Sequence, residues 1–103
     1  MLLTEDAERD LEELYDYLAA HDATGKADHV LSQISKVVSA LAEMPKRGSH
    51  PKELTALGNR EFREVFFKPY RIIYRVMGDR VYVMLIADGR RSLQDYLQLR
   101  LLG

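Results

Sequence analysis

The first 44 residues carry apolar side chains at intervals of three and four positions, the spacing that places them on one face of an α-helix. Thr4 can cap the first such helix, which we predict over about 5–20. After a short break, a second apolar stripe predicts a helix over 27–44 that is stopped by Pro45. Because a short loop joins two helices that cannot bury their stripes alone, we expect an antiparallel hairpin that covers a sheet.

The later part of the chain changes to the alternation of apolar and polar residues that is typical of strands. Three strands are expected, at 60–67, 69–76 and 81–87. A tight turn at Met77–Arg80 joins the last two strands. The segment 45–59 is rich in Pro and Gly and is expected to be a loop, and helical spacing returns over 91–102.

These elements predict one α+β domain over residues 1–103, because neither a repeat nor a linker interrupts the chain. The expected architecture is an N-terminal antiparallel helical hairpin packed on a small antiparallel β-sheet, followed by a C-terminal helix, in the order (β)ααβββα. The bracketed strand is Met1–Leu3, which is either a short edge strand or a lead-in. The helices are expected on one face of the sheet, leaving the other face open.

Composition removes several classes of function. The chain lacks cysteine, which excludes disulfides, thiolate metal sites and a cysteine nucleophile and fits a cytoplasmic protein. Its three histidines do not have the spacing of metal ligands, so we expect no metal, and the usual nucleotide-binding fingerprints are missing, so we expect no cofactor. The longest apolar stretch is only strand-sized, so no membrane partner is expected.

Charge divides the chain into two unlike parts. Residues 1–44 hold ten acidic and three basic side chains, whereas residues 45–103 hold six acidic and twelve basic ones, nine of them arginines. Such an asymmetry is what an electrostatic binding surface requires. Because arginine prefers phosphate or carboxylate partners, the basic part points to nucleic acid or to an acidic protein.

Arg71 and Arg75 alternate along the second strand and therefore share a face. Arg71 either points from the open face at a phosphate or is a solvent-facing residue that pairs with a cross-strand acid such as Glu64. The other candidate binding arginines are Arg60, Arg63, Arg90 and Arg91. Tyr96 can serve in proton transfer or base stacking, or it can lie in the core with its hydroxyl at the rim.

Several motifs, taken together, resemble the RelE/ParE superfamily of bacterial type II toxins. They are Asp10–Tyr17, Leu41–Pro45 with Gly48, Phe66–Val76 and Ile86–Arg91. The resemblance implies a compact growth-inhibiting toxin that a cognate antitoxin holds silent. The antitoxin is expected to be an acidic, partly disordered chain that folds on binding and lays an amphipathic helix on the hairpin.

The superfamily has two kinds of target, and the resemblance implies different site residues for each. RelE-like members cut mRNA on the ribosome without a metal ion, and in that case Arg71, Arg91 (or Arg90) and Tyr96 are the expected catalytic residues. ParE-like members inhibit DNA gyrase and are not known as nucleases.

The first strand has Phe62, Glu64 and Phe66 roughly where RelE-like enzymes carry cations. An acid at that place would repel a phosphate, although Arg60 and Arg63 are alternative cations. The segment 88–96 also resembles plasmid-stabilisation sequences of the ParE type. ParE-like gyrase inhibition is therefore the first expectation and ribosome-dependent cleavage of mRNA the alternative, so whether the chain is an enzyme stays open.

Overall fold

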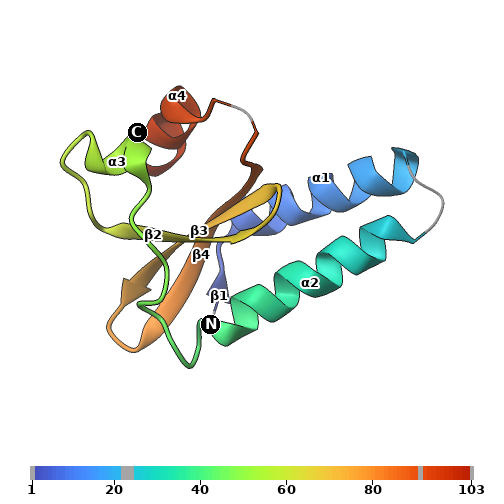
Figure 1. Cartoon of the computed structure of the whole chain (residues 1–103), viewed down its shortest axis with the longest axis horizontal. Helices are drawn as coiled ribbons and strands as arrows, with labels where there is room; N and C mark the ends of the chain where they lie inside the picture. The colour runs from blue at the N-terminus through green and yellow to red at the C-terminus, as the bar shows by residue number, and fades with distance from the viewer. Residues whose placement is uncertain (1, 22–24, 91, 103) are drawn as a thin grey trace.

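The computed structural model describes residues 2–21, 25–90 and 92–102. In chain order its elements are β1 (Leu2–Leu3), α1 (Glu5–His21), α2 (Lys26–Ala40), α3 (Lys52–Thr55), β2 (Phe62–Phe67), β3 (Tyr70–Met77), β4 (Arg80–Asp88), α4 (Gln94–Leu97) and a final π-helical turn, η1 (Gln98–Leu102). Figure 1 shows the two long helices side by side at one end of the molecule. The predicted α+β class is confirmed, and so is the predicted order of elements except for the additional short helix α3.

The sheet has the strand order β1-β4-β3-β2. The strands β2, β3 and β4 form the expected antiparallel meander, while β1 pairs with β4 in parallel, opposite Tyr82 and Val83. Leu2 and Leu3 therefore form an edge strand and not a lead-in, while Met1 lies outside the described residues. This order leaves β1 and β2 at the two edges, and β1 covers only part of β4.

The helical hairpin forms as the apolar stripes require. The Thr4 hydroxyl accepts a hydrogen bond from the Ala7 amide at 3.1 Å, which satisfies one of the free N–H groups of the first turn of α1. The helix α2 ends at Ala40 and not near Met44, because the next amides bond to carbonyls three residues back and tighten the chain. The buried contact between hairpin and sheet is made by Ala7, Leu18, Ala27, Val30, Ile34, Val38, Tyr70, Ile72, Val83 and Ile86.

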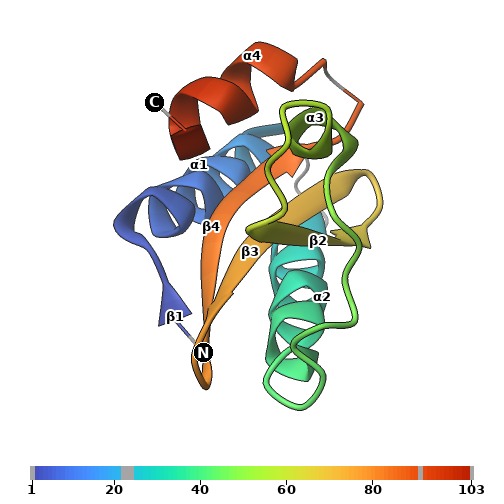
Figure 2. The same cartoon turned by 90° about the vertical axis from the view of Figure 1, so that its left-hand side faces the viewer.

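The second face of the sheet is also covered, contrary to expectation. Leu54 of α3 and Leu97 of α4 are fully buried against Ile73 and Leu85 of the sheet. Figure 2 shows α3 and α4 together above the central strands. The helix α3 was missed because it is a single turn within a segment that otherwise reads as a loop. The expected open face therefore does not exist where α3 and α4 lie.

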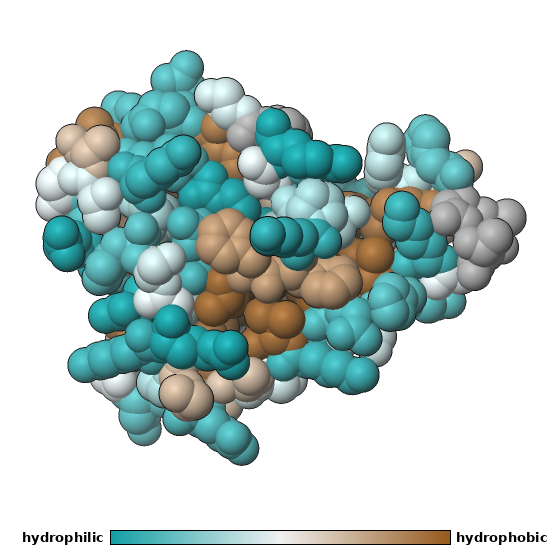
Figure 3. Space-filling view, viewed as in Figure 1, coloured by the Kyte–Doolittle hydropathy of each residue, from teal (hydrophilic) through white to brown (hydrophobic). Residues whose placement is uncertain are grey.

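A β-bulge in β4 turns Val83 and Leu85 to opposite faces of the sheet, whereas an ordinary strand would place them on the same face. The pairing with β3 shifts between Ile73, which faces Leu85, and Tyr74, which faces Val83. Met84 is thus the extra residue, and Val83 packs toward the hairpin while Leu85 packs toward α4. Figure 3, in the view of Figure 1, shows a patch of apolar surface between β2 and α2 on the face that it presents.

Candidate functional surface

The guanidinium group of Arg71 lies buried between two carboxylates. Its Nη1 and Nη2 atoms donate to the two oxygens of Glu53 at 2.5 and 2.8 Å, and its Nε donates to Glu64 Oε1 at 2.7 Å. The three side chains are only 8–9% exposed. Arg71 therefore holds α3, which carries Glu53, and β2, which carries Glu64, onto the central strand β3.

The electrostatics of this cluster favour its ionised form. The hydrogen bonds from Arg71 hold the pKa of the Glu53 carboxyl below its ordinary value, although burial opposes that shift. The hydrogen bonds to Glu53 raise the pKa of Arg71 in turn, against the effect of burial. Two carboxylates surround one guanidinium, so the cluster as a whole is negative. A phosphate would have to displace at least one carboxylate to reach Arg71.

The structure agrees in full with neither of the two interpretations of Arg71. Pairing with Glu64 is confirmed, but the side chain is buried and does not face solvent. The interpretation as a cation that points from an open face is wrong, because α3 places Glu53 over it. Arg71 and Arg75 do share a face of β3 as predicted, since both contact residues of the same face of β2.

The strand exit at residues 88–90 forms a local turn. Arg90 donates to Asp88 from its backbone amide at 2.9 Å and from Nη2 at 2.6 Å, and 73% of its side chain is exposed. Gly89 is needed here because a Cβ atom would lie 2.8 Å from Cγ of Arg71 and 3.0 Å from the Pro69 carbonyl oxygen. Arg91, the second expected catalytic arginine, lies outside the described residues.

The remaining predicted arginines do not converge on one point. Arg63 donates to the Gly48 carbonyl at 2.8 Å and to that of Lys46 at 3.2 Å, so it braces the segment before α3. Arg75 lies 6.0 Å over the ring of Phe62 and 3.7 Å from a carboxylate oxygen of Glu61. Arg60 is exposed just before β2.

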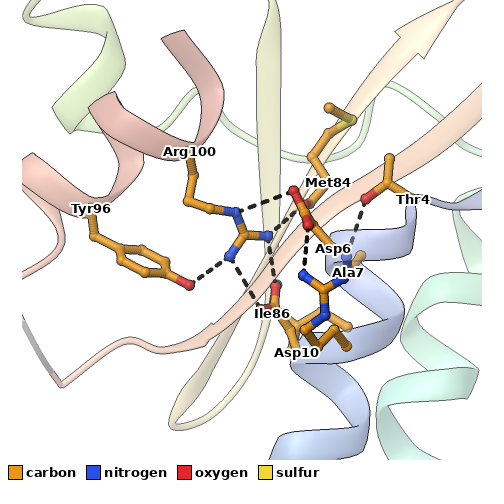
Figure 4. Close-up of polar contacts among 9 residues, drawn as sticks. Thr4, Asp6, Ala7, Asp10, Met84, Ile86, Tyr96 and Arg100 are labelled. Carbon is orange, nitrogen blue, oxygen red and sulfur yellow. Dashed lines mark hydrogen bonds and ion pairs between the residues drawn. The ribbon is translucent and has the colours of Figure 1, made fainter. Parts of the chain in front are cut away.

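Tyr96 belongs to a second polar cluster, which joins the C-terminal helix to α1 (Figure 4). Its hydroxyl accepts from Nη1 of Arg100 at 2.5 Å, and the guanidinium carbon of Arg100 lies 5.4 Å from the ring centroid. Arg100 also donates to both oxygens of Asp10, at 3.0 and 3.2 Å. Burial is the largest single influence on the pKa of Arg100 and lowers it, but the hydrogen bonds with Asp10, together with the charges of Asp10, Tyr96 and Asp6, outweigh burial and raise the pKa.

The same pair of side chains satisfies the backbone of β4 beyond the end of β1. Asp10 Oδ2 accepts from the Ile86 amide at 3.1 Å, and Arg100 Nη2 donates to the Met84 carbonyl oxygen at 3.2 Å. The two side chains therefore take the place of a neighbouring strand at the bulge. We did not predict the role of Arg100. The spacing of Tyr96 and Arg100, one helical turn apart, is the only sequence signal that could have suggested part of it.

A groove of about 530 Å³ runs over the hairpin. Its apolar lining comes from β1, α1 and α2, and its polar lining is acidic. The lining residues are Leu3, Glu8, Leu11, Glu12, Tyr15, Asp16, Asp28 and Leu31. The Tyr15 hydroxyl donates to Asp28 at 2.9 Å across the two helices, and this bond raises the pKa of Tyr15. The groove has the shape and lining to receive an amphipathic segment.

Two further observations bear on ligands and membranes. Among the described residues, no three His, Asp or Glu side chains are grouped so that they could hold a metal ion. In the same part of the chain, no helix combines the length and the apolar character that crossing a membrane requires.

Comparisons with known proteins point to one family. The family model described as the ParE toxin of the type II toxin-antitoxin system, parDE, matches residues 1–93. A solved structure, described as the chromosomal ParDE TA system from P. aeruginosa, is similar with a TM-score of 0.70 and 22% sequence identity. That match covers 84% of this chain and 91% of the other. None of the curated proteins searched matches the chain.

Proposed function

Because the chain belongs to the ParE toxin family of type II toxin–antitoxin systems, we propose that it inhibits bacterial growth by inhibiting DNA gyrase. The action is a protein–protein contact made in the cytoplasm, where gyrase works, and the antitoxin relieves it. The family supports this target. One observation of the structure supports this target over the alternative, cleavage of mRNA on the ribosome.

The observation is the burial of Arg71. A nuclease of the expected kind needs this arginine to stabilise the negative charge that develops on the phosphate. Here both edges of the guanidinium are bound to Glu53 and Glu64, and only 8% of the side chain is exposed. Exposing Arg71 to RNA would leave two carboxylates without their partner, which is costly. This arrangement supports a toxin without nuclease activity.

The contact with gyrase is proposed at the C-terminal segment. Leu99 and Leu102 are 75% and 41% exposed, although apolar side chains of this size usually lie inside a domain. Arg100, one residue from Leu99, fixes this turn to α1 and β4. The segment therefore presents its leucines from a fixed position, which lowers the entropy lost when they bind.

The antitoxin is proposed to lay an amphipathic helix in the groove over the hairpin. The carboxylates of Glu8, Glu12 and Asp16 line that groove beside the apolar side chains. Basic residues on one edge of the helix would complement them. The acidic part of the antitoxin must then bind elsewhere, on the basic half of the toxin.

The test is a pair of assays on the same purified protein. Gyrase, relaxed plasmid and ATP report supercoiling and cleaved DNA, while a translating extract with a defined mRNA reports cleavage of the message. We expect lost supercoiling or gyrase-dependent DNA breaks, with intact mRNA. Cleavage of mRNA in phase with codons and normal supercoiling would instead establish the ribonuclease and overturn the proposal.

A matched pair of variants tests the contact. Leu99→Asp should fold normally and lose gyrase inhibition, because the side chain is exposed in the proposed surface. Met77→Asp is the control, since Met77 is 49% exposed at the β3–β4 turn, far from α4 in Figure 2. Equal inhibition by both variants would place the contact outside the C-terminal segment.

A further inference from the structure

A cleft of about 980 Å³ lies where the helical hairpin extends past the end of the sheet. Figure 1 shows α1 and α2 continuing beyond the turn that joins β2 to β3. The walls of the cleft come from both helices, from this turn and from the end of β4, and it shares no lining residue with the groove over the hairpin. Its volume is in the range of sites for small molecules.

The Tyr70 hydroxyl faces this cleft without a partner in the protein. Tyr70 is only 6% exposed, and no residue of the described ranges hydrogen-bonds to its hydroxyl. The residues whose charges act on it, Asp88, Arg90 and Tyr17, all line the cleft. Burial, followed by the charge of Asp88, raises the pKa of Tyr70, so the phenol keeps its proton at neutral pH. It can therefore donate to an oxygen atom of a ligand that enters the cleft.

Three cations belong to the lining of the cleft. Lys26 and Lys68 are exposed, and neither forms an ion pair with a carboxylate of the described ranges. Arg90 bonds to Asp88 through Nε and Nη2, so its Nη1 remains for a ligand. Cationic donors of this kind are the usual partners of phosphate oxygens.

The acidic side chains of the lining are largely compensated. Asp10 accepts from Arg100, and Asp88 accepts from Arg90. Glu13, exposed on α1, forms no ion pair with the residues that the structure describes. One such acid against two unpaired lysines leaves the cleft positive at neutral pH, so it attracts an anion.

Aromatic rings line the same cleft. The Tyr17 side chain is 60% exposed, and its ring stacks on His21 with the two centroids 4.2 Å apart. His29 meets Phe67 edge-on, with the centroids 6.5 Å apart, and all four rings belong to the lining. An exposed tyrosine ring is a surface on which a planar ligand stacks.

We propose that this cleft binds a nucleoside phosphate. The base stacks on the Tyr17 ring, the Tyr70 hydroxyl donates to a phosphate oxygen, and the three cations neutralise the phosphate. A planar ring and an anion within one ligand match the two halves of the lining. A free nucleotide and a single nucleotide of an unpaired nucleic-acid strand offer this same chemistry. The inference is independent of whether gyrase is the target.

Isothermal titration of the purified toxin tests the proposal with four probes. They are adenosine diphosphate, guanosine diphosphate, adenosine and inorganic phosphate. Two bases are used because stacking alone does not distinguish them. We expect the diphosphates to bind with dissociation constants below about 1 mM, and adenosine or phosphate alone at least about tenfold more weakly. Amide chemical shifts should change at Tyr70 and Lys68 and not at Lys36, which lies on α2 outside the cleft.

Two matched tyrosine variants separate binding from folding. Tyr70→Phe removes a hydroxyl without a protein partner, so the melting temperature should not fall, while the diphosphates should bind about tenfold more weakly. Tyr74→Phe is the control, because the Tyr74 hydroxyl donates to the Pro45 carbonyl at 2.7 Å and accepts from the Gly48 amide at 3.0 Å, outside the cleft. It should lower the melting temperature by about 4 °C or more and leave binding unchanged.

Charge reversal gives a second pair. Lys68→Glu should weaken binding of the diphosphates at least about tenfold, whereas Lys36→Glu should not change it. Binding that both Tyr70→Phe and Lys68→Glu leave intact would overturn the proposal, as would phosphate binding as tightly as the diphosphates.

An unpaired oligoadenylate of about eight nucleotides identifies the source of the ligand. If it binds more tightly than adenosine diphosphate and Tyr70→Phe weakens it equally, the site takes a nucleotide of a nucleic-acid strand. Weaker binding of the oligoadenylate supports a free nucleotide as the ligand. Failure of both probes to bind would sink the proposal and leave the result of the gyrase assay unaffected.

Discussion

Arg71 and Arg100 have the same chemistry but different positions in the protein. Arg71 holds the connecting helix α3 on the sheet through its bonds to Glu53. Arg100 holds the C-terminal turn η1 on α1 through its bonds to Asp10. Arg71 is 8% exposed and hydrogen-bonds to two buried carboxylates, whereas Arg100 is 19% exposed and hydrogen-bonds to Asp10, a carbonyl and a phenol, with the exposed Asp6 as a looser ion-pair partner at 3.8 Å. The first cluster is part of the core, and the second lies at its margin.

This difference separates stability from function. A guanidinium enclosed by two carboxylates cannot exchange them for a target without exposing buried charge, so we expect Arg71 to contribute mainly to the stability of the fold. Arg100 instead fixes the segment on which Leu99 is exposed, and a change there alters a surface more than a core. The comparison predicts that a substitution at Arg71 mainly lowers the free energy of unfolding, whereas a substitution at Arg100 mainly weakens target inhibition.

The largest effect is expected for Arg71→Met. The change keeps most of the apolar stem but leaves Glu53 and Glu64 as buried carboxylates without their partner. We expect the free energy of unfolding at neutral pH to fall by about 3–5 kcal/mol. Urea denaturation followed by circular dichroism measures it. A loss of less than about 1 kcal/mol, as for a surface ion pair, would contradict the assigned burial.

The pH dependence of stability is the control for this variant. Because the folded-state pKa of Glu53 is lowered, its contribution in the wild type is present above the ordinary carboxyl pKa and is lost as the pH falls through the lowered value. In Arg71→Met the carboxyl gains no such bonds, and protonation relieves its burial. The difference in stability between the two proteins should therefore narrow from neutral pH toward acid.

A smaller loss of stability and a larger loss of function are expected for Arg100→Met. Asp10 keeps its bond from the Ile86 amide, but the Met84 carbonyl loses its donor. We expect a loss of roughly 1–3 kcal/mol, faster amide exchange across η1, and weaker gyrase inhibition. Arg9→Met is the control, because its ion pair with Asp6 is exposed. Normal inhibition with η1 loosened would show that the leucines need no fixed position.

The next largest effect is expected at Gly89, which packs tightly against Arg71 and Pro69. A Cβ atom at position 89 would lie 2.8 Å from the Arg71 stem and 3.0 Å from the Pro69 carbonyl oxygen. The stem can shift a little, but the carbonyl is backbone and already accepts the Gly89 amide at 2.7 Å. Gly89→Ala should therefore destabilise by about 1 kcal/mol, the low end of overpacking. Thermal unfolding measures it, and an unchanged melting temperature would contradict the close approach.

The two clusters also show what the sequence could predict. Pairing between Arg71 and Glu64 follows from a hairpin whose register is set by the short turn at residues 68–69, so it was foreseeable. Glu53 was not, because it reaches Arg71 from a single helical turn in an apparent loop. The bond between Asp10 and Arg100 joins residues 90 positions apart. No local pattern specifies such a pair, because it depends on how α1 and the C-terminal helix meet.

The same reasoning applies to the fold. Periodicity predicted the hairpin and the meander, since each element signals its own exposed and buried sides. The bulge at Met84 and the covering of the second face by α3 and α4 depend on contacts between distant elements. Arg71 was assigned to an open face for this reason. The error in the site followed directly from the error in the fold.

The smallest effect is expected for Arg90→Ala, although Arg90 and Arg71 were predicted as members of one basic surface. Arg90 is 73% exposed and bonds to Asp88, two residues away, within one turn. Solvent screens such a pair, so the melting temperature should change by no more than about 1 °C. If stability is unchanged but gyrase inhibition falls, Arg90 belongs to the target surface, as proposed for Leu99, and the division between core and surface arginines becomes sharper. If Arg90→Ala instead destabilises as strongly as Arg71→Met, exposure does not separate the two groups, and the comparison on which these predictions rest is wrong.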